Sequence, residues 1–389
     1  MAKVHGRASV VKLDDLGGAL IDISTFLDGV PQFQRTVGRD ETQSFGDEAK
    51  RRGVVGLRSA SLGIQGFLQA TSGTKLHGRA SRVLLDEYSL INYLDQMTVR
   101  RSVDLPPTQT FGDAWVEHGI TGLYDGAISG SGFYDPAAGE INDILEAIDA
   151  AAATSLWDVA PNGFVIGQPV DMARGGLGNW DVPTDENQPT RTTFDVALDS
   201  RVDVGVSLHD LSAETAVASF TGVDEAAATA LGGVGHIHVT AFSGTNATVL
   251  IQDSVDDTDI NYGTLITFAS ITGVGKERVE LGSTAAVKRF VRARISVDNF
   301  TSMTFVVTFA RRGYTSATLA PAGTHRFFGG LVGAAAGSFE YGPGGSTSGL
   351  AKILGECRAS TYEVTYDENS PTRFKVDIVS DGALTETNW

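Results

Sequence analysis

The N-terminal third of the sequence contains one pattern twice, and this duplication restricts the possible folds more than any other feature. The segment Lys3-Val-His-Gly-Arg-Ala-Ser9 returns as Lys75-Leu-His-Gly-Arg-Ala-Ser81, and Arg35-Thr-Val37 returns as Arg101-Ser-Val103. The spacing between copies is 72 residues at the start and 66 afterwards. One loop therefore differs in length, and the sequence otherwise repeats a structural unit in register.

A second repeat lies near the C-terminus. Asp185-Glu-Asn-x-Pro-Thr-Arg191 returns as Asp367-Glu-Asn-x-Pro-Thr-Arg373, in each case before a segment with strand character. The chain thus carries two first halves followed by two second halves. Because chains rarely cross between domains, we expect nesting: residues 1–74 and 313–389 form one domain, which encloses a second domain at 75–211.

Between these halves, residues 233–312 have a different character. Six short segments of alternating apolar and polar residues are separated by turn-rich clusters, a spacing typical of an antiparallel β-sandwich. We expect an inserted sandwich module there, with the Ala- and Thr-containing segment 212–232 as the linker leading into it.

One amphipathic helix is predicted after the second copy. Asp135-Pro136 is a helix start signal, and Ile141, Ile144, Leu145 and Ile148 fall on one helical face. Burying each of them contributes roughly 1.5–3 kcal/mol, so this helix should pack against a sheet. No comparable helix is expected in the C-terminal half, where Gly329–Gly337 is a poor substitute. The predicted fold class is mainly β.

Amino-acid composition and net charge argue against several classes of binding site. The chain has 389 residues, a net charge of −17 and a pI near 4.8, the opposite of the balance that proteins use to grip phosphates. A single cysteine, Cys357, excludes an internal disulfide framework and a cysteine-based zinc site. We expect no signal peptide and no membrane span.

Motifs for catalysis or ligand binding are incomplete. His236 and His238 could form a metal pair on one strand face, but a half-buried structural face is the favoured interpretation without a third ligand. Four acidic residues between Asp253 and Asp259 lack the calcium-loop pattern, and Gly342–Gly349 lacks the Gly-Lys pair of a phosphate-binding loop. We expect no catalytic residues, no metal, no cofactor and no enzyme activity.

The repeated unit resembles the major tail tube proteins of long-tailed (siphovirus-type) phages. The resemblance covers most of the chain and is carried by patterned motifs in both copies and in the C-terminal half: Ile23–Asp28, Phe33–Val37, Phe45–Asp47, Gly56-Leu57, Gly66-Phe67, Leu90–Asp95, Arg101–Asp104, Thr110–Asp113, Gly119–Leu123, Ser129–Phe133 and Leu354–Val364. The insert is similar to Ig-like or carbohydrate-module-like sandwiches attached to such proteins.

This resemblance implies two tail-tube-type β-sandwich domains, each with one helix, whose strands join a continuous inner barrel in a ring of six domains. Three chains would then complete a pseudo-six-fold ring. It also implies that the long loops reach the adjacent ring. The residues expected to make these inter-ring contacts are Phe45, Gly46 and Asp47 in the first copy and Phe111, Gly112 and Asp113 in the second.

The implied partners are further copies of the chain, a tape measure protein and a tail terminator. Phage DNA would pass through an acidic lumen without specific binding, and the protein would be located in the virion tail after assembly in the host cytoplasm. Two alternatives stay open. One is an adhesion or carbohydrate-binding virion protein that acts through 233–312; the other is a head or tail-terminator component with the same tube fold.

Overall fold

Antiparallel strands make up most of the chain in the computed structural model, which describes residues 9–14, 18–42, 51–69, 75–108, 113–118, 122–137, 139–151, 154–313 and 323–389. The described residues include two α-helices, α1 (Ile141–Ala151) and α3 (Gly323–Leu331). Neither helix has the length or apolar run that a membrane crossing requires. The predicted mainly β fold class is confirmed.

The two copies have the same element order. The first consists of β1 (Val10–Asp14), β2 (Leu20–Asp22), β3 (Gln32–Thr42), β4 (Arg51–Phe67), α3, β18 (Gly337–Gly342), β19 (Ala351–Asp367) and β20 (Arg373–Ser380). The second consists of β5 (Arg82–Leu85), β6 (Tyr88–Ser89), β7 (Leu94–Val103), β8 (Tyr124–Phe133), α1, β9 (Ser155–Ala160), β10 (Pro169–Asp181) and β11 (Arg191–Leu198). A last strand, β21 (Thr385–Asn388), pairs with β19. Short 3-10 turns lie at Ser24–Phe26, Gly78–Ala80 and Asp259–Asn261.

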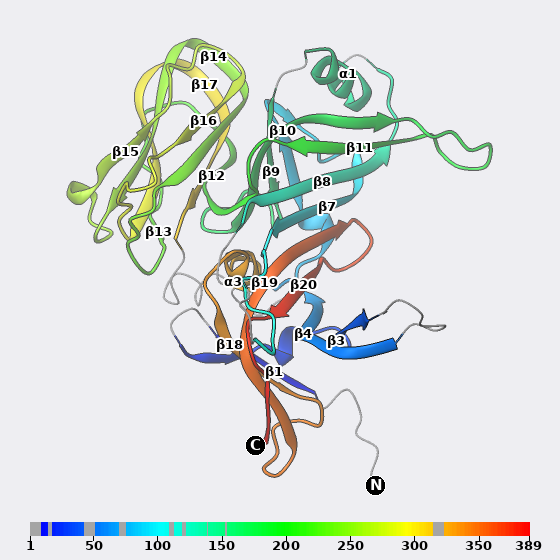
Figure 1. Cartoon of the computed structure of the whole chain (residues 1–389). Helices are drawn as coiled ribbons and strands as arrows, with labels where there is room; N and C mark the ends of the chain where they lie inside the picture. The colour runs from blue at the N-terminus through cyan, green and yellow to red at the C-terminus, as the bar shows by residue number, and fades with distance from the viewer. Residues whose placement is uncertain are drawn as a thin grey trace.

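Strand pairing joins halves that are far apart in the sequence (Figure 1). β1 pairs with β18 and β4 with β20, while β5 pairs with β9 and β8 with β11. β9, β10 and β11 begin at 155, 169 and 191, and β18, β19 and β20 begin at 337, 351 and 373, so each equivalent pair is 182 residues apart. This is the pairing that nested copies require, because the first copy's opening strands meet the end of the chain.

Helix α3 corrects one sequence expectation, because the C-terminal half does contain a helix comparable to α1. Its sequence includes Gly329 and Gly330, which lowers its intrinsic helix propensity. Burial stabilises it instead: Phe327 and Phe328 are 6% and 0% exposed, and the Phe328 ring stacks on Phe374 at 4.5 Å. Local sequence did not predict this helix because packing, not propensity, maintains it.

The inserted sandwich is larger than its predicted limits. It contains β12 (Asp203–Glu214), β13 (Val223–Asp224), β14 (Gly233–Ser254), β15 (Gly263–Thr267), β16 (Gly275–Glu280) and β17 (Phe290–Arg311). β14 and β17 pair along almost their whole lengths, with four shifts of register between Val239 and Val249. The segment 212–232, expected as a linker, includes the end of β12 and β13, and both pair with β17.

The two copies and the sandwich have different hydrophobic cores. One cluster includes buried residues of both copies, among them Leu62, Val99, Trp157 and Phe374. The sandwich has a separate cluster that includes Ile237 and Phe305. The two copies therefore share one continuous core, and the sandwich is built around its own.

The glycine repeated at 66 and 132 has a structural explanation. A Cβ added to Gly66 would lie 2.1 Å from the carbonyl oxygen of Phe26, and one added to Gly132 would lie 2.0 Å from that of Tyr93. Neither distance is compatible with a side chain, because the neighbour in each case is backbone. In the first copy, β4 packs closely against the turn before β3. In the second copy, β8 packs in the same way against the turn before β7.

We expect Gly132→Ala to lower the free energy of unfolding by about 1–3 kcal/mol, because the methyl group must displace backbone in a packed region. Denaturant unfolding of the full chain measures the change. Gly273→Ala is the matched control, since its Cβ would meet nothing within 4 Å. Equal stability of the two variants would contradict the steric explanation.

Candidate functional site

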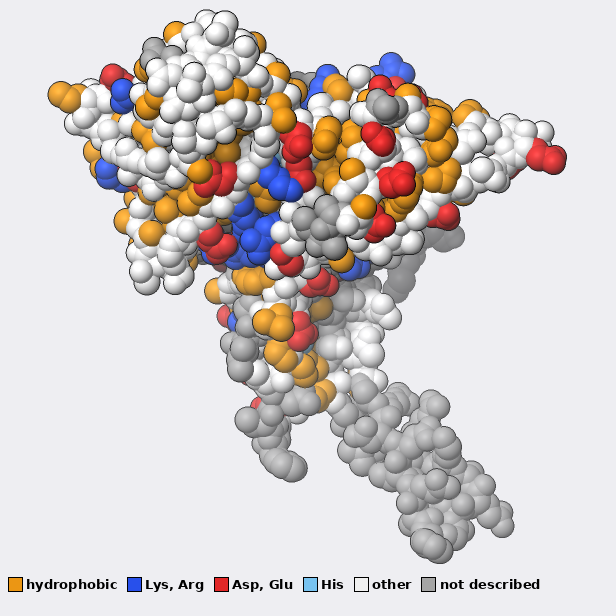
Figure 2. Space-filling model, turned by 90° about the horizontal axis from the view of Figure 1, so that it is seen from above, with side chains coloured by type: hydrophobic (Ala, Val, Ile, Leu, Met, Phe, Trp, Pro, Cys, Tyr) orange, Lys and Arg blue, Asp and Glu red, His pale blue; other side chains and the backbone are white. Residues whose placement is uncertain are grey.

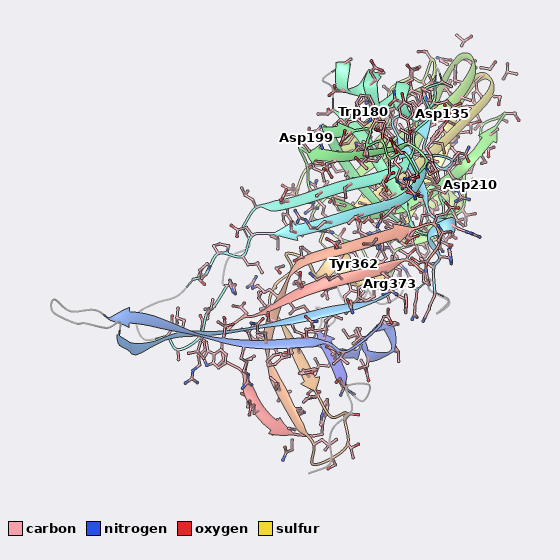
Figure 3. The ribbon with its side chains drawn as sticks, turned by 90° about the vertical axis from the view of Figure 1, so that its right-hand side faces the viewer. Asp135, Trp180, Asp199, Asp210, Tyr362 and Arg373 are labelled. Atoms are coloured by element: carbon pink, nitrogen blue, oxygen red, sulfur yellow. The ribbon has the colours of Figure 1, made fainter. Side chains whose placement is uncertain are left out.

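The central feature of the molecule is one sheet of eight strands to which each copy contributes four. Its order is β3–β4–β20–β19–β7–β8–β11–β10. The strands lie side by side in Figure 3, where the β3–β4 hairpin projects from the body. The seam between the copies is the β19–β7 pair, which runs antiparallel from Thr361↔Ser102 to Asp367↔Gln96.

The outer strands of this sheet leave two edges open. Among the described residues, β3 is paired only with β4, and β10 from Gly176 to Asp181 is paired only with β11. Gln34, Arg35 and Asp181 are exposed along these edges. An unpaired edge presents backbone donors and acceptors that can pair with another strand.

The two open edges are equivalent to the two strands of the internal seam. β3 is the first copy's counterpart of β7, because Arg35 repeats as Arg101, and β10 is the second copy's counterpart of β19. The pairing that joins the copies inside the chain can therefore be repeated between the β10 edge of one chain and the β3 edge of another.

One face of the eight-stranded sheet is polar. Side chains alternate along each strand, so Met97, Val99 and Val103 of β7 point to the core while Thr98 and Arg100 point away from it. Among the residues whose side chains are described, this polar face carries six carboxylates and four basic groups: Asp125, Asp181, Asp195, Glu363, Asp367 and Asp377, with Arg100, Arg191, Arg373 and Lys375. It is therefore mildly acidic.

Three of the four basic groups described on this face have a carboxylate partner, namely Arg191, Arg373 and Lys375. Arg191 lies 2.5 Å from the carboxylate of Asp95, and Lys375 lies 3.2 Å from that of Asp377. Arg191 also lies over the Phe133 ring at 5.3 Å, and the equivalent Arg373 lies over Phe67 at 5.1 Å. The duplication thus repeats the pattern of this face as well as its backbone.

Most of the loop residues predicted to contact an adjacent ring lie outside the described residues. These are Phe45, Gly46, Asp47, Phe111 and Gly112. Asp113 is half-buried and begins a described stretch, 113–118, that packs on the first copy. There the Arg58 N–H donates to the Ala114 carbonyl at 3.0 Å and the Val116 N–H donates to the Arg58 carbonyl at 2.9 Å. This loop of the second copy therefore contacts the first copy of its own chain.

The four residues predicted for helix packing lie together in the structure. Ile141, Ile144, Leu145 and Ile148 of α1 are 0–9% exposed and belong to the shared core. The α1 helix begins at Ile141, after Asp135, whose carboxylate accepts the Ala137 N–H at 3.0 Å.

A buried polar network joins the second copy to the sandwich. Asp158 of β9 lies 2.7 Å from Nδ1 of His236 and 3.2 Å from Nε2 of His238, and accepts the Thr308 hydroxyl at 2.6 Å. Arg278 donates to Nε2 of His236 at 2.8 Å, so the proton of His236 is on Nδ1. Sequence reasoning singled out the two histidines but missed Asp158, because nothing local connects residues so far apart.

The protonation of this network follows from its contacts. Burial lowers the pKa of His236, and Asp158 only partly opposes it. Burial also disfavours a charged His238, but Asp158 and the Asp86 carbonyl outweigh that effect and raise its pKa. Burial raises the pKa of Asp158, and the two histidines more than reverse this. The network is therefore an Asp158–His238 ion pair next to a neutral His236.

These three residues are the group in the described part of the chain whose ligand atoms could hold a metal ion, within 4.8 Å of one another. Asp158 and His236 already use these atoms in hydrogen bonds, His238 is ion-paired with Asp158, and the Arg278 guanidinium adds positive charge beside them. This arrangement favours a structural junction.

The acidic segment between Asp253 and Asp259 forms local hydrogen bonds. The carboxylate of Asp256 accepts the Thr258 N–H and the Asn261 side-chain amide.

A second buried network joins the sandwich to the first copy. Both carboxylate oxygens of Glu225 accept from Arg326 of α3, at 2.7 and 2.6 Å, and one also accepts from Arg311 of β17 at 2.9 Å. All three residues are at most 4% exposed. Glu225 lies in the segment expected to be a linker, so no sequence signal indicated this triad.

The sandwich aromatics are mainly internal. Phe268, Phe300, Phe305 and Phe309 are 0–8% exposed, and a sugar-stacking surface needs exposed rings. The described aromatic rings therefore give no support to the carbohydrate-binding alternative.

No family model matches the chain, and no curated protein matches it. Among solved structures, a chain from the virion of a native gene transfer agent particle is 14% identical, with 33% of this chain and 97% of that chain covered and a TM-score of 0.28. The phage SPP1 Dit protein, described as a hub adsorption apparatus protein, is 11% identical, with 59% and 98% covered and a TM-score of 0.25. A chain of infectious bursal disease virus, Gx strain, is 10% identical, with 100% and 78% covered and a TM-score of 0.17. TM-scores this low do not establish a shared fold.

Proposed function

We propose that this chain is a structural subunit of a phage tail tube, and that three copies close a ring through their eight-stranded sheets. The observation that carries the proposal is the internal β19–β7 seam, together with the two open edges that duplicate its strands. A head-to-tail contact of this kind generates rings when its rotation closes. The motifs shared with tail tube proteins give the same assignment from the sequence.

The internal seam also defines the expected register between chains. Glu363 faces Arg100 in the seam; its counterpart 182 positions earlier is Asp181, and the counterpart of Arg100 66 positions earlier is Gln34. We therefore expect Asp181 of one chain to lie opposite Gln34 of the next. In the seam, the Glu368 N–H donates to the Asp95 carbonyl, and alternation makes Glu363/Arg100 a pair without direct hydrogen bonds.

The polar face suits the inner surface of such a tube. Its six described carboxylates and four described basic groups give a mildly acidic surface, and three of those basic groups already have carboxylate partners. Phosphate groups of DNA would find few free cations there, so DNA can pass without sequence-specific or tight binding. The sandwich would then lie on the outside, and further copies, a tape measure protein and a tail terminator would be the partners.

Cysteine cross-linking of assembled protein tests the ring. We expect Asp181→Cys combined with Gln34→Cys to oxidise into covalent trimers on a denaturing gel, because directly opposite residues meet the distance that a disulfide requires. The native Cys357 is buried and 8% exposed, so it does not interfere. The matched control is Asp181→Cys with Gln32→Cys, two residues out of register on the same face.

Electron microscopy of the same sample checks the architecture. Uniform tubes or rings with three outer knobs are expected. Covalent hexamers, or rings with six knobs, would contradict a three-chain ring, and monomers that never assemble would contradict the tube.

A further inference from the structure

One charged side chain lies on the buried face of the central sheet. Arg101 follows Met97 and Val99 on the core-facing side of β7 and is 4% exposed. Its Nε and Nη1 atoms are buried and have no hydrogen-bond acceptor among the described residues. A guanidinium remains charged at any physiological pH, and a buried donor without an acceptor is costly, so such a group implies a missing water or ion.

The duplication provides an internal comparison. Arg35 occupies the same position in the first copy, and its guanidinium is paired with Glu386. In the described part of the chain, no carboxylate lies within ion-pairing distance of Arg101. The Arg101 guanidinium lies over the ring of Tyr124, with its central carbon 5.9 Å from the ring centroid. The second copy has kept the cation and lacks the anion that neutralises it in the first.

Arg101 lines a cavity of about 500 Å³ where three parts of the molecule meet. The second copy contributes Arg101 and Tyr124, the sandwich contributes Arg312, and the first copy contributes the loop around Gly333. Gly333 packs directly on Tyr124, since an added Cβ would lie 2.5 Å from that ring, and its carbonyl accepts the Tyr124 hydroxyl at 3.3 Å. The cavity is therefore built from contacts between separate units.

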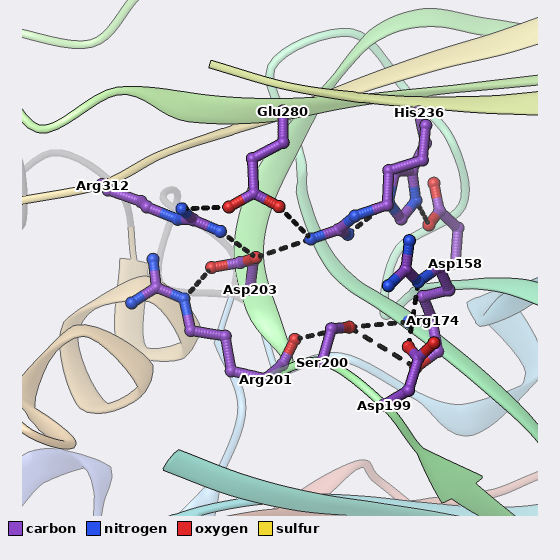
Figure 4. Close-up of polar contacts among 10 residues, drawn as sticks. Asp158, Arg174, Asp199, Ser200, Arg201, Asp203, His236, Glu280 and Arg312 are labelled. Atoms are coloured by element: carbon purple, nitrogen blue, oxygen red, sulfur yellow. Dashed lines mark hydrogen bonds and ion pairs between the residues drawn. The ribbon is translucent and has the colours of Figure 1, made fainter. Parts of the chain in front are cut away.

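Further guanidinium groups lie in or beside the same cavity. The Arg201 side chain is 5.2 Å from the Tyr124 centroid and donates to Asp203 at 2.5 Å. Arg312 reaches Glu280 and lies 3.8 Å from Asp203 (Figure 4). Lys and Arg side chains gather between the sandwich and the neighbouring domain when the molecule is viewed from above (Figure 2).

The charges of this region do not balance. Asp203 and Glu280 are shared among Arg201, Arg312 and Arg278, which lies 3.8 Å from Asp203 and 3.4 Å from Glu280. Asp14 is the carboxylate among the described lining residues, and it accepts the Gly18 N–H at 3.0 Å. Among the described residues, four guanidinium groups thus face three carboxylates, and the buried Arg101 is the one of the four without a direct ion pair.

We infer that this cavity binds one small oxyanion, of the phosphate or sulfate class, with Arg101 as its main ligand and Arg201 and Arg312 beside it. A small ion is required because Arg101 is too deeply buried for a macromolecular group to reach. The bound anion would connect both copies and the sandwich, and would stabilise their arrangement by mass action.

Titration of the anion-free full chain with inorganic phosphate tests this site, with ionic strength held constant by chloride. Calorimetry should give one site per chain, and the melting temperature should rise with phosphate concentration. Arg101→Met should weaken binding at least tenfold and remove the rise in melting temperature. It should also melt no lower than the native chain in phosphate-free buffer, because it removes an unpaired buried charge; a purely structural arginine would give the opposite sign.

Arg289→Met is the matched control, since Arg289 is an exposed arginine that pairs with Asp224 in the sandwich. It should bind phosphate as the native chain does. Equal binding by Arg101→Met and the native chain, or a phosphate response no larger than that of chloride, would overturn the inference.

A second variant decides the matter if Arg101→Met does not fold. Ala334 lines the cavity, and Ala334→Asp would supply an internal carboxylate. We expect it to raise the melting temperature in phosphate-free buffer and to remove the phosphate response. A full phosphate response in Ala334→Asp would count against the site.

Discussion

Glu225→Gln is expected to lower the free energy of unfolding by about 3–5 kcal/mol, because it leaves two arginines buried without their shared carboxylate. Glu225 is 2% exposed and binds Arg311 and Arg326 through three hydrogen bonds of 2.6–2.9 Å. The size of the effect comes from stranding Arg311 and Arg326, not from the net value of the ion pairs. Denaturant unfolding at pH 7 measures it.

The adjacent residue is a matched control. Asp224 also pairs with an arginine, Arg289, but both side chains are more than 40% exposed, and exposed pairs contribute about 0–1 kcal/mol. Asp224→Asn should therefore change stability little. Comparable losses in the two variants would show that the Glu225 network is not effectively buried.

The same triad predicts a dependence on pH. Burial raises the pKa of Glu225, but the charges and hydrogen bonds of Arg326 and Arg311 outweigh burial, so its folded-state pKa lies below the ordinary 4.5. Its stabilising contribution is present above pH 4.5 and is lost as pH falls through the folded-state pKa. The difference in unfolding free energy between the native chain and Glu225→Gln should therefore shrink below about pH 4.5. A constant difference down to pH 2 would contradict this linkage.

Arg35→Pro is expected to weaken ring and tube assembly while leaving the chain folded. In the internal seam, the alternation defined by the Glu368–Asp95 hydrogen bond directs the Arg101 N–H toward β19. The equivalent Arg35 N–H should point from the open edge of β3 toward the next chain. Proline removes that donor and is tolerated on an edge strand whose N–H faces solvent.

The loss should raise the critical concentration for assembly at least tenfold, since one hydrogen bond is worth about 1 kcal/mol and every seam in the ring loses one. Sedimentation of assembled protein measures it. Arg35→Ala is the control, because it removes the same exposed ion pair with Glu386 and keeps the backbone N–H. Tubes formed equally well by both variants would rule out pairing at this edge.

Local sequence signals predicted much of the fold. The matching segments around Arg35 and Arg101, and the Asp-Glu-Asn segments before Arg191 and Arg373, gave the duplication and the order of the halves. Residue alternation gave the sandwich, and the spacing of Ile141, Ile144, Leu145 and Ile148 gave α1. These features depend on short-range periodicity, which the chain carries wherever it folds.

The inter-ring contacts expected from Phe45, Gly46, Asp47, Phe111 and Gly112 remain a prediction. The described stretch 113–118 of the second loop packs on Arg58 of the same chain. Any contact of this loop with another ring would lie beside its contact with Arg58, which the sequence did not suggest.

The sequence alone was enough to predict two similar units and the nesting of one within the other, and it gives an acidic net charge. Three-dimensional packing was needed to find that β19 pairs with β7, that Glu225 joins Arg311 to Arg326, that α3 is a helix and that Arg101 is buried without an ion pair among the described residues. Each of these features depends on side chains or strands from distant parts of the chain. Periodicity specifies which face of an element is buried, but not which distant element will cover it.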